Sequence, residues 1–420
     1  MKNLFNLVIT ACATATLALA GACSTNDADA GNFFLFEASG DVDGVDVLES
    51  YAKDVVITRY ENLADKAQAL YHATQEITFG ASDESTKIAA AAAAWVEARL
   101  AWERTEAYLF GPVDLYKIDP GIDSWPLALA DLAVFMTGYA AGTYSDYHIA
   151  NDNGERKGFH AVEFLLFEDG NSKKALTDFN SAEISSSYGL SSVAGADVQK
   201  YLVAIAKELY YNTVLLVAEW EDIDAVASYE AADALSVKTN NGGGYYDDFT
   251  TAGDDESSYS SISDALSVIL ENAAGIAEEV GDVKISDPYT SKDVLDVESW
   301  FSWNSVYDFT DNIIGIKEAY YGKLYSGLSD DYTATAFGSA AANSISAYVA
   351  SGSSNLDTLV KEAIEEAIEK VAALPYPFRS YLSDSSKSAD IEAAMDACLE
   401  LVDALAMAQS AVNDGYYITE

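Results

Sequence analysis

The chain has 420 residues, half of them hydrophobic, and its 68 Asp and Glu residues outnumber its 23 Lys and Arg residues to give a formal net charge of −45. So large a negative charge repels phosphate backbones and anionic headgroups, which argues against nucleic-acid binding. The length is long for one core, and the scarcity of proline among tracts rich in Ala, Leu and Glu favours helices, so two helical units are expected.

The first 22 residues have the pattern of an export signal. Lys2 precedes a mostly apolar run over residues 4–19, and small residues then lead to Cys23. Small residues followed by cysteine are typical of a bacterial lipoprotein signal. This makes Cys23 the lipidated first residue of the mature chain and residues 23–44 a tether. A second, shorter match ends at Cys12, and plain secretion without a lipid is the alternative.

The cysteines and the hydropathy of the chain argue against a disulfide-stabilised protein and against further membrane spans. After processing only Cys398 remains unmodified, which excludes an internal disulfide framework and a Cys-rich metal site. No other apolar stretch approaches the roughly 18 residues that a membrane span requires. We therefore expect attachment to the bacterial cell envelope through the lipid alone, at the outer membrane on its periplasmic side or at the cell surface.

Residues 45–222 are predicted to form an N-terminal helical bundle. Apolar residues recur there at intervals of three and four over about 45–78, 84–110, 127–139 and 197–220. In the second of these helices, one stripe of the surface carries Trp95, Arg99, Trp102 and Glu106. Two tryptophans indicate that this stripe is buried, so Arg99 and Glu106 are expected to meet partners from other helices. On an exposed stripe they would form only an ion-pair pattern within the helix.

The stretch GFHAVEFLLF, residues 158–167, combines a histidine and a carboxylate with apolar residues on every side. His160 and Glu163 are three residues apart, so on a helix they leave the same face one turn from each other. A helix that is apolar all round is normally buried, and a buried charge needs a partner. A metal ion would supply one, because imidazole and carboxylate are both good ligands. The alternative is a pair of hydrogen-bonded core residues.

Residues 223–258 contain NNGGGYYDDFTTAGDDESS, the clearest change of composition, and are predicted to be a linker or an excursion. Residues 259–420 then form a predicted C-terminal helical bundle. The run VESWFSWNSVYDFTDNIIGI predicts one helix in which a polar stripe is formed by Glu298, Ser302, Ser305, Asp308 and Asn312. A stripe facing solvent would more often contain Lys and Glu, so burial of this stripe is expected.

Four motifs, which stand in the chain in the order expected for the family, make it similar to the imelysin-like family. The family's G-x-H-x-x-E motif is matched by Gly158, His160 and Glu163. A tryptophan, arginine and glutamate pattern followed by Gly-Pro is matched by Trp95, Arg99, Trp102, Glu106, Gly111 and Pro112. Trp125-Pro126 matches a WP pair, and the E-S-x-F-S block is matched by Glu298, Ser299 and Ser302. The resemblance extends from about residue 45 to the C-terminus.

The resemblance implies an all-α fold of two related antiparallel helical bundles, export to the periplasm or outer membrane, and a role in iron acquisition. The family is also filed among metallopeptidases. Zinc peptidases commonly use H-E-x-x-H, which this chain lacks, and only His72 and His148 could supply a second imidazole. An H-x-x-E pair with a distant third ligand remains open.

These observations together predict a lipid-anchored, helical binding protein of iron acquisition. His160, Glu163 and Glu106 are the expected metal ligands, and Arg99 balances the charge nearby. The expected lining of the site is Arg99, Trp102, Trp125, Gly158, Glu298, Ser299 and Ser302. The ligand would be a metal ion, iron before zinc, or an iron chelate or haem, passed to an outer-membrane or uptake-system partner. The alternatives are a zinc-dependent metallopeptidase and a buried polar latch without a ligand.

Overall fold

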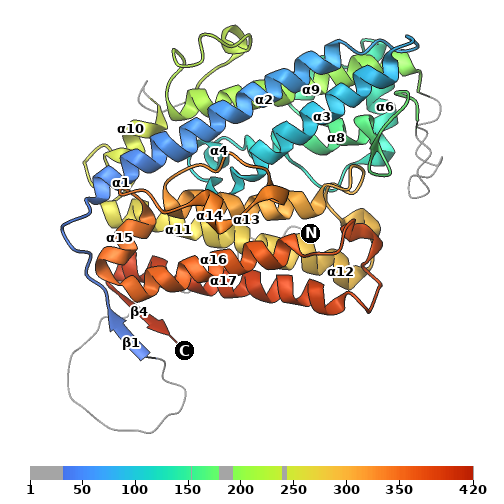
Figure 1. The fold of residues 1–420 in the computed structure, drawn as a ribbon. Coiled ribbons are helices and arrows are strands. Elements are labelled where there is room, and N and C mark those ends of the chain that lie inside the picture. The colour runs from blue at the N-terminus through green and yellow to red at the C-terminus, as the bar shows by residue number, and fades with distance from the viewer. Residues whose placement is uncertain (1–31, 153, 179–192, 239–243, 420) are drawn as a thin grey trace.

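The computed structural model describes residues 32–152, 154–178, 193–238 and 244–419 (Figure 1). Over these residues the protein is all-α apart from two short two-stranded sheets, as expected. The predicted signal peptide, Cys23 and the first part of the tether lie outside the described residues.

The N-terminal helices pack around α9. The helix α1 (Gly44–Ser50) continues through a π-helical segment (Tyr51–Ile57) into α2 (Thr58–Gln75). The others are α3 (Glu84–Glu103), α4 (Pro112–Leu115), α5 (Asp119–Ile122), α6 (Leu129–Ala140), α7 (Asp146–Ala150), α8 (Gly158–Leu166) and α9 (Gly195–Trp220). Both α2 and α8 pack against α3 and α9. The helix predicted over 84–110 ends at Glu103 and is followed by a 3-10 turn, Glu106–Tyr108.

The C-terminal helices pack around α17. The helix α11 (Ile262–Glu278) continues through a second π-helical segment (Glu279–Ser286) into α12 (Asp287–Ser291), whereas α10 (Tyr245–Thr250) before it packs against α1 and α9 of the N-terminal group. The remaining helices are α13 (Ser305–Tyr321), α14 (Ala334–Phe337), α15 (Ile345–Gly352), α16 (Ser354–Ala372) and α17 (Ser388–Asp414). Both α11 and α16 pack along α17, and α13 packs against α11 and α16.

The helices form two layers, with α2, α3, α8 and α9 above and α11, α13, α16 and α17 below in Figure 1. The layers meet where α13 packs against α3 and the 3-10 turn after it. Gly315 of α13 permits this approach, since a Cβ there would lie 2.6 Å from the carbonyl oxygen of Arg104. The helices themselves form for the predicted reason. In α11, for example, Leu266, Ile269 and Ala273 recur at helical spacing and are buried.

The segment before α13 differs from its prediction. Residues 298–304 do not belong to a helix, because Ser299 and Trp303 adopt positive φ values of 53° and 64°, which a helix does not allow. The expectation of one continuous polar stripe from Glu298 is therefore wrong, and helix begins only at Ser305. The turn is fixed by a neighbour, since the backbone N–H of Gly170 donates to the carbonyl of Phe301 at 2.9 Å.

Two small sheets were not predicted. The strand β1 (Asn32–Leu35) pairs antiparallel with β4 (Tyr416–Thr419), which joins the two ends of the described chain at one end of the molecule (Figure 1). The strands β2 (Phe167–Glu168) and β3 (Asn171–Ser172) form a hairpin directly after α8. Short strands of this kind have too few residues for a period-2 pattern to stand out.

The long helix α9 corrects one expectation. Contrary to the prediction that no further stretch is apolar enough, α9 alone among the described helices is long and apolar enough to cross a membrane. Most of its apolar window is buried inside the protein, where it packs against α2, α6 and α8. A buried core helix meets the same criteria, so α9 is accounted for by its packing.

Candidate metal centre

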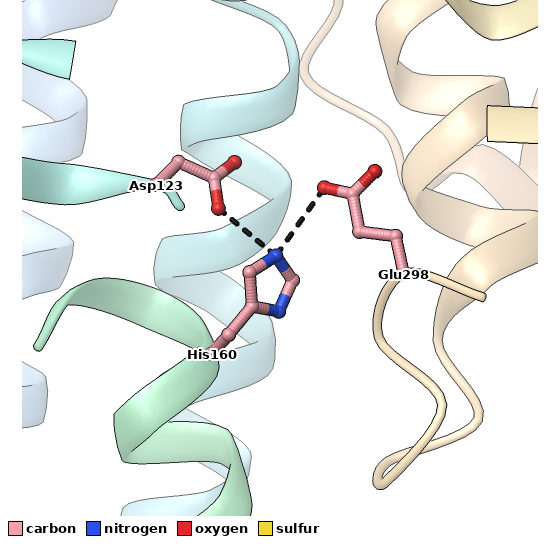
Figure 2. A group of neighbouring side chains, drawn as sticks. All are labelled: Asp123, His160 and Glu298. Atoms are coloured by element: carbon pink, nitrogen blue, oxygen red, sulfur yellow. Dashed lines mark hydrogen bonds and ion pairs between the residues drawn. The ribbon is translucent and has the colours of Figure 1, made fainter. Parts of the chain in front are cut away.

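Side chains from both layers meet in a buried polar cluster between α3, α8 and the turn before α13. Figure 2 shows its centre, where Asp123, just after α5, and Glu298 point toward the imidazole of His160 on α8. Nε2 of His160 lies 3.0 Å from Oδ1 of Asp123 and 3.3 Å from Oε1 of Glu298. One ligand atom from each of these residues lies within 4.8 Å of the others.

The chemistry of this triad fits a metal ion. One imidazole nitrogen and two carboxylate oxygens form a donor set used by zinc and by iron. Oδ1 of Asp123 is buried, and Nε2 of His160, 3.0 Å away, is its one partner among the described residues. A cation between these atoms would take the place of the proton that Nε2 otherwise presents to the two carboxylates.

Glu163 contacts the other side of the imidazole. Its Oε2 lies 3.0 Å from Nδ1 of His160, and its Oε1 accepts hydrogen bonds from the backbone N–H and the hydroxyl of Ser302 at 2.8 and 2.7 Å. Glu163 therefore fixes the ring orientation and holds a proton on Nδ1, which directs Nε2 toward the two carboxylates. The structure thus brings His160, Glu163 and Ser302 together, but with Glu163 on the nitrogen that faces away from Asp123 and Glu298.

Close backbone packing puts Asp123 beside His160. Gly158 begins α8 with a φ of 75°, and a Cβ at this position would lie 2.3 Å from the carbonyl oxygen of Ile122. Only glycine fits this backbone and this approach, which explains the first residue of the G-x-H-x-x-E motif. Trp125 covers the imidazole, with ring centroids 4.8 Å apart.

Arg99 is the central cation of the cluster. Its guanidinium is fully buried and contacts Glu103 at 2.5 Å, Asp123 at 2.6 Å, Glu298 at 2.5 Å and Asp308 at 3.3 Å. The indole N–H of Trp102 donates to Oδ2 of Asp123 at 2.8 Å. The second oxygen of Asp123 is therefore saturated, which leaves Oδ1 for the position near His160.

Glu106 lies in a neighbouring part of the cluster. Its Oε2 accepts from Lys284 at 2.8 Å and from the amide of Asn312 at 2.6 Å. Lys284, in the second π-helical segment, also lies 3.2 Å from Oε2 of Glu298. The structure therefore joins Glu106 to the triad through Lys284, without bringing its carboxylate among the ligand atoms around Nε2.

The charges of the triad are strongly coupled. Burial opposes the charged imidazolium, but Asp123 and a hydrogen bond to Glu163 raise the pKa of His160 well above its usual value. Burial would raise the pKa of Glu298, yet Lys284 and His160 lower it to about 2. Burial would likewise raise the pKa of Asp123, but Arg99 and His160 lower it well below its usual range. In the absence of an ion, a proton on Nε2 supplies the positive charge between the carboxylates.

In the rest of the cluster, acidic groups outnumber the cations Arg99 and Lys284. Burial raises the pKa of Glu103 well above its usual value, that of Glu106 above it, and that of Asp308 to about 7. Burial opposes the charge of Lys284, but Glu106 and Glu298 raise its pKa well above the usual value. Buried acids that hold protons near neutral pH indicate that the cluster would accept a further cation.

A pocket of about 330 Å³ leads from the cluster to the surface. Its charged lining consists of one ammonium and six carboxylates, from Lys284, Glu106, Asp119, Asp123, Glu279, Asp296 and Glu298. Such a lining attracts cations and repels anions.

The other histidines take no part in the described cluster. His72 pairs with Glu230 at 2.8 Å at the surface, and Nδ1 of His148 accepts from the backbone N–H of Ser145. Sequence reasoning missed Asp123, Glu103 and Lys284 as members of the cluster. Asp123 had a signal, since it stands in the ordered turn IDPGIDSWP before Trp125-Pro126. No sequence signal identified Lys284, because it belongs to the other layer and lies in an acidic helical segment without a motif.

Ser299 and Ser302 lie in the turn that carries Glu298. Ser299 is fully buried, and the hydroxyl of Ser302 also donates to its carbonyl oxygen at 3.2 Å. The hydroxyl of Ser305 donates to the carbonyl of Glu298 at 2.6 Å. These bonds hold the irregular backbone in the shape that aims Glu298 at His160.

Known proteins are similar to this chain in sequence and in fold. Residues 56–405 match the imelysin family. Iron-regulated protein A of Synechococcus elongatus is 25% identical over 303 residues, which are 71% of each chain. The crystal structure of a putative iron-regulated protein A precursor from Parabacteroides distasonis superposes with a TM-score of 0.71 at 27% identity, over 90% of this chain and 98% of that one. Because the family match spans most of its length, the chain belongs to the imelysin family.

Proposed function

We propose that this chain is an exported, lipid-anchored protein of iron acquisition that binds a metal ion at Asp123, His160 and Glu298. The observation that carries the proposal is the convergence of one imidazole nitrogen and two carboxylate oxygens, which lie within 4.8 Å of one another in a buried cluster. The relation to proteins named as iron-regulated favours iron as the ion, and zinc is compatible with the same donors.

Each neighbour of the triad has a defined role in this proposal. Glu163, held by Ser302, keeps Nδ1 protonated so that Nε2 is the ligand atom. Arg99 offsets the carboxylates that the ion does not contact, and Trp125 covers the imidazole. The ion replaces the proton on Nε2, so the charge between the carboxylates is retained when it binds.

The pocket favours a small cation over the other ligands considered. Its volume of about 330 Å³ lies at the lower end of the roughly 300–1,000 Å³ typical of organic ligand sites. Haem is a large ligand that carries carboxylates, and these would be repelled by Asp123 and Glu298, whose pKa values are lowered by the cations around them. A hydrated cation meets neither obstacle.

The cellular setting rests on the N-terminal sequence. The export signal and Cys23 support an envelope protein held by lipid, with its layers on the periplasmic side of the outer membrane or at the cell surface. We propose that it passes its ion to an outer-membrane or uptake-system partner. Mass spectrometry of the membrane-extracted chain, looking for an acylated N-terminal Cys23, tests the anchor independently of metal binding.

A second candidate function is zinc-dependent peptide hydrolysis. Asp123, His160 and Glu298 would hold zinc with three protein ligands, the number found in catalytic zinc sites, and the ion would supply a Lewis acid next to the pocket. A peptidase also needs a cleft for an extended chain. A zinc-loaded sample that leaves unfolded protein substrates intact would reject this candidate.

Calorimetric titration of the mature chain with ferrous, ferric and zinc ions tests the main proposal. We expect one ion per chain for the wild type and at least tenfold weaker binding for His160→Ala and Asp123→Asn. The matched control is His72→Ala, which removes an exposed imidazole outside the cluster and should bind as the wild type does. Unchanged binding in His160→Ala together with a lower melting temperature would instead establish the cluster as a structural latch.

A further inference from the structure

The ribbon formed by β1 and β4 has an outward face made of large apolar side chains. Phe33 pairs with Ile418 and Leu35 with Tyr416 across the ribbon. Directly opposite residues share a face, and so do residues two apart in one strand. These four side chains therefore lie on one face, and the ring of Phe33 stacks on that of Tyr416 at 5.1 Å.

This outward face is more exposed than apolar residues of a folded protein usually are. Phe33 is 59% exposed, Leu35 80%, Tyr416 38% and Ile418 51%. The other face holds the ribbon to the protein, since Tyr417 is buried and its hydroxyl lies 3.0 Å from that of Ser353. A contiguous apolar patch of this kind marks an interaction site.

The composition of the ribbon selects the kind of partner. None of its eight residues, Asn32–Leu35 and Tyr416–Thr419, carries a charged side chain, in a chain of net charge −45. Aromatic rings mixed with aliphatic side chains are typical of protein segments at a lipid–water boundary, where the rings lie at the level of the headgroups.

The position of the ribbon in the chain brings it close to a membrane. Asn32 follows Cys23 by nine residues, and an extended chain spans at most about 3.6 Å per residue, so the ribbon begins within about 30 Å of that cysteine. If Cys23 carries a lipid, as the proposed function holds, the ribbon begins close to the bilayer.

We infer that the outward face of the β1–β4 ribbon docks on a lipid surface and inserts Phe33, Leu35, Tyr416 and Ile418 among the headgroups. The contact adds to the lipid anchor and fixes which end of the molecule faces the membrane. Because the chain is strongly acidic, it favours electrically neutral lipids over anionic ones.

The test uses the mature chain with Cys23→Ser, which cannot be acylated, so the outcome does not depend on the anchor. Its sedimentation with phosphatidylcholine vesicles is compared with that of the same chain carrying Phe33→Ser and Leu35→Ser. We expect the double replacement to lower vesicle binding about tenfold or more, since it removes most of the inserted apolar surface. The matched control is Leu115→Ser with Val134→Ser, two exposed apolar residues on α4 and α6, which should bind like the parent.

A second measurement keeps the test decisive if the double variant folds poorly. Leu35→Cys in the Cys23→Ser chain carries a polarity-sensitive dye, while Cys398 is buried. Vesicles of phosphatidylcholine should shift the dye emission to the blue, and vesicles rich in phosphatidylserine should do so less at low salt. No shift with either vesicle would overturn the inference, as would a mass that doubles with concentration through the ribbon in the absence of lipid. Acylation of Cys23 in the wild type, together with no vesicle binding by the Cys23→Ser chain, would leave the anchor standing and reject the ribbon contact alone.

Discussion

Replacing Arg99 with methionine should destabilise the protein by removing the cation that four buried carboxylates share. Methionine keeps much of the apolar stem while deleting the charge and its contacts to Glu103, Asp123, Glu298 and Asp308. Removing one partner of a buried ion pair costs about 3–5 kcal/mol, because the remaining charge stays buried.

The loss of stability should stay within this range although Arg99 contacts four carboxylates. Asp308 has a pKa of about 7 and Glu103 a pKa well above its usual value, mainly through burial, so both take up a proton at little cost. Asp123 and Glu298 keep His160 as a partner. Their pKa values should rise in the variant, and a rise of two units corresponds to about 2.7 kcal/mol.

The sign of the pH dependence follows from linkage. A carboxyl whose folded-state pKa is raised favours the folded state below its unfolded pKa and loses that contribution as the pH rises. The destabilisation by Arg99→Met should therefore be largest near pH 7 and shrink toward pH 5. Urea unfolding of metal-free protein, followed by circular dichroism and tryptophan fluorescence at both pH values, measures it.

Lys66→Met is the control, because Lys66 pairs with Glu97 at the surface, where both side chains are exposed. Partly exposed and surface ion pairs contribute about 0–1 kcal/mol, so this variant should change stability little at either pH. A loss below about 1 kcal/mol for Arg99→Met at pH 7, or a larger loss at pH 5, would refute the assignment of Arg99 as the central buried cation.

Three further predictions concern the site and the one thiol of the described chain. Glu163→Gln should weaken metal binding about 10–100-fold in calorimetric titration, because the partner of Nδ1 loses its charge; equal affinity would show that Glu163 does not tune His160. Since the pKa of His160 is raised by its carboxylate neighbours despite burial, affinity should fall about tenfold per pH unit below that pKa, with about one proton released per ion. Titrations in buffers of different ionisation enthalpy count the proton, and a count of zero contradicts the exchange. Burial raises the pKa of Cys398 to about 12, so in the Cys23→Ser mature chain it should react with a thiol reagent only after unfolding.

Most of the long helices could be predicted from the sequence because they bury a stripe of apolar residues at helical spacing. The segments over 45–78, 84–110 and 197–220 follow this rule, with ends shifted by a few residues. The turn before α13 could not be predicted in this way. Its composition is helical, but Ser299 and Trp303 take positive φ values because the turn packs against the hairpin after α8. The helix propensity of residues 298–304 contains no information about their packing against the hairpin.

The sequence pointed to His160 as a ligand and to Glu298 as part of the lining, but it missed Asp123 and offered Glu163 and Glu106 as the further ligands. The spacing of His160 and Glu163 indicated a shared face correctly, yet it could not tell which ring nitrogen each carboxylate would face. Nε2 meets Glu298 across 138 positions of sequence, a pairing that only tertiary packing creates. Tertiary packing also brings Lys284 into the cluster, and nothing in the sequence around Lys284 indicates this.

The origin of the triad in two layers has a consequence for how occupancy can be followed. Asp123 and His160 belong to the N-terminal layer and Glu298 to the C-terminal one, so an ion held by all three exists only while the layers are docked. Such an ion raises the apparent free energy of unfolding by about 2.7 kcal/mol when its free concentration is a hundred times the dissociation constant. Resistance to heat or to a protease then reports loading without any colour or label. In the cell, the same coupling would make a depleted chain the shorter-lived one.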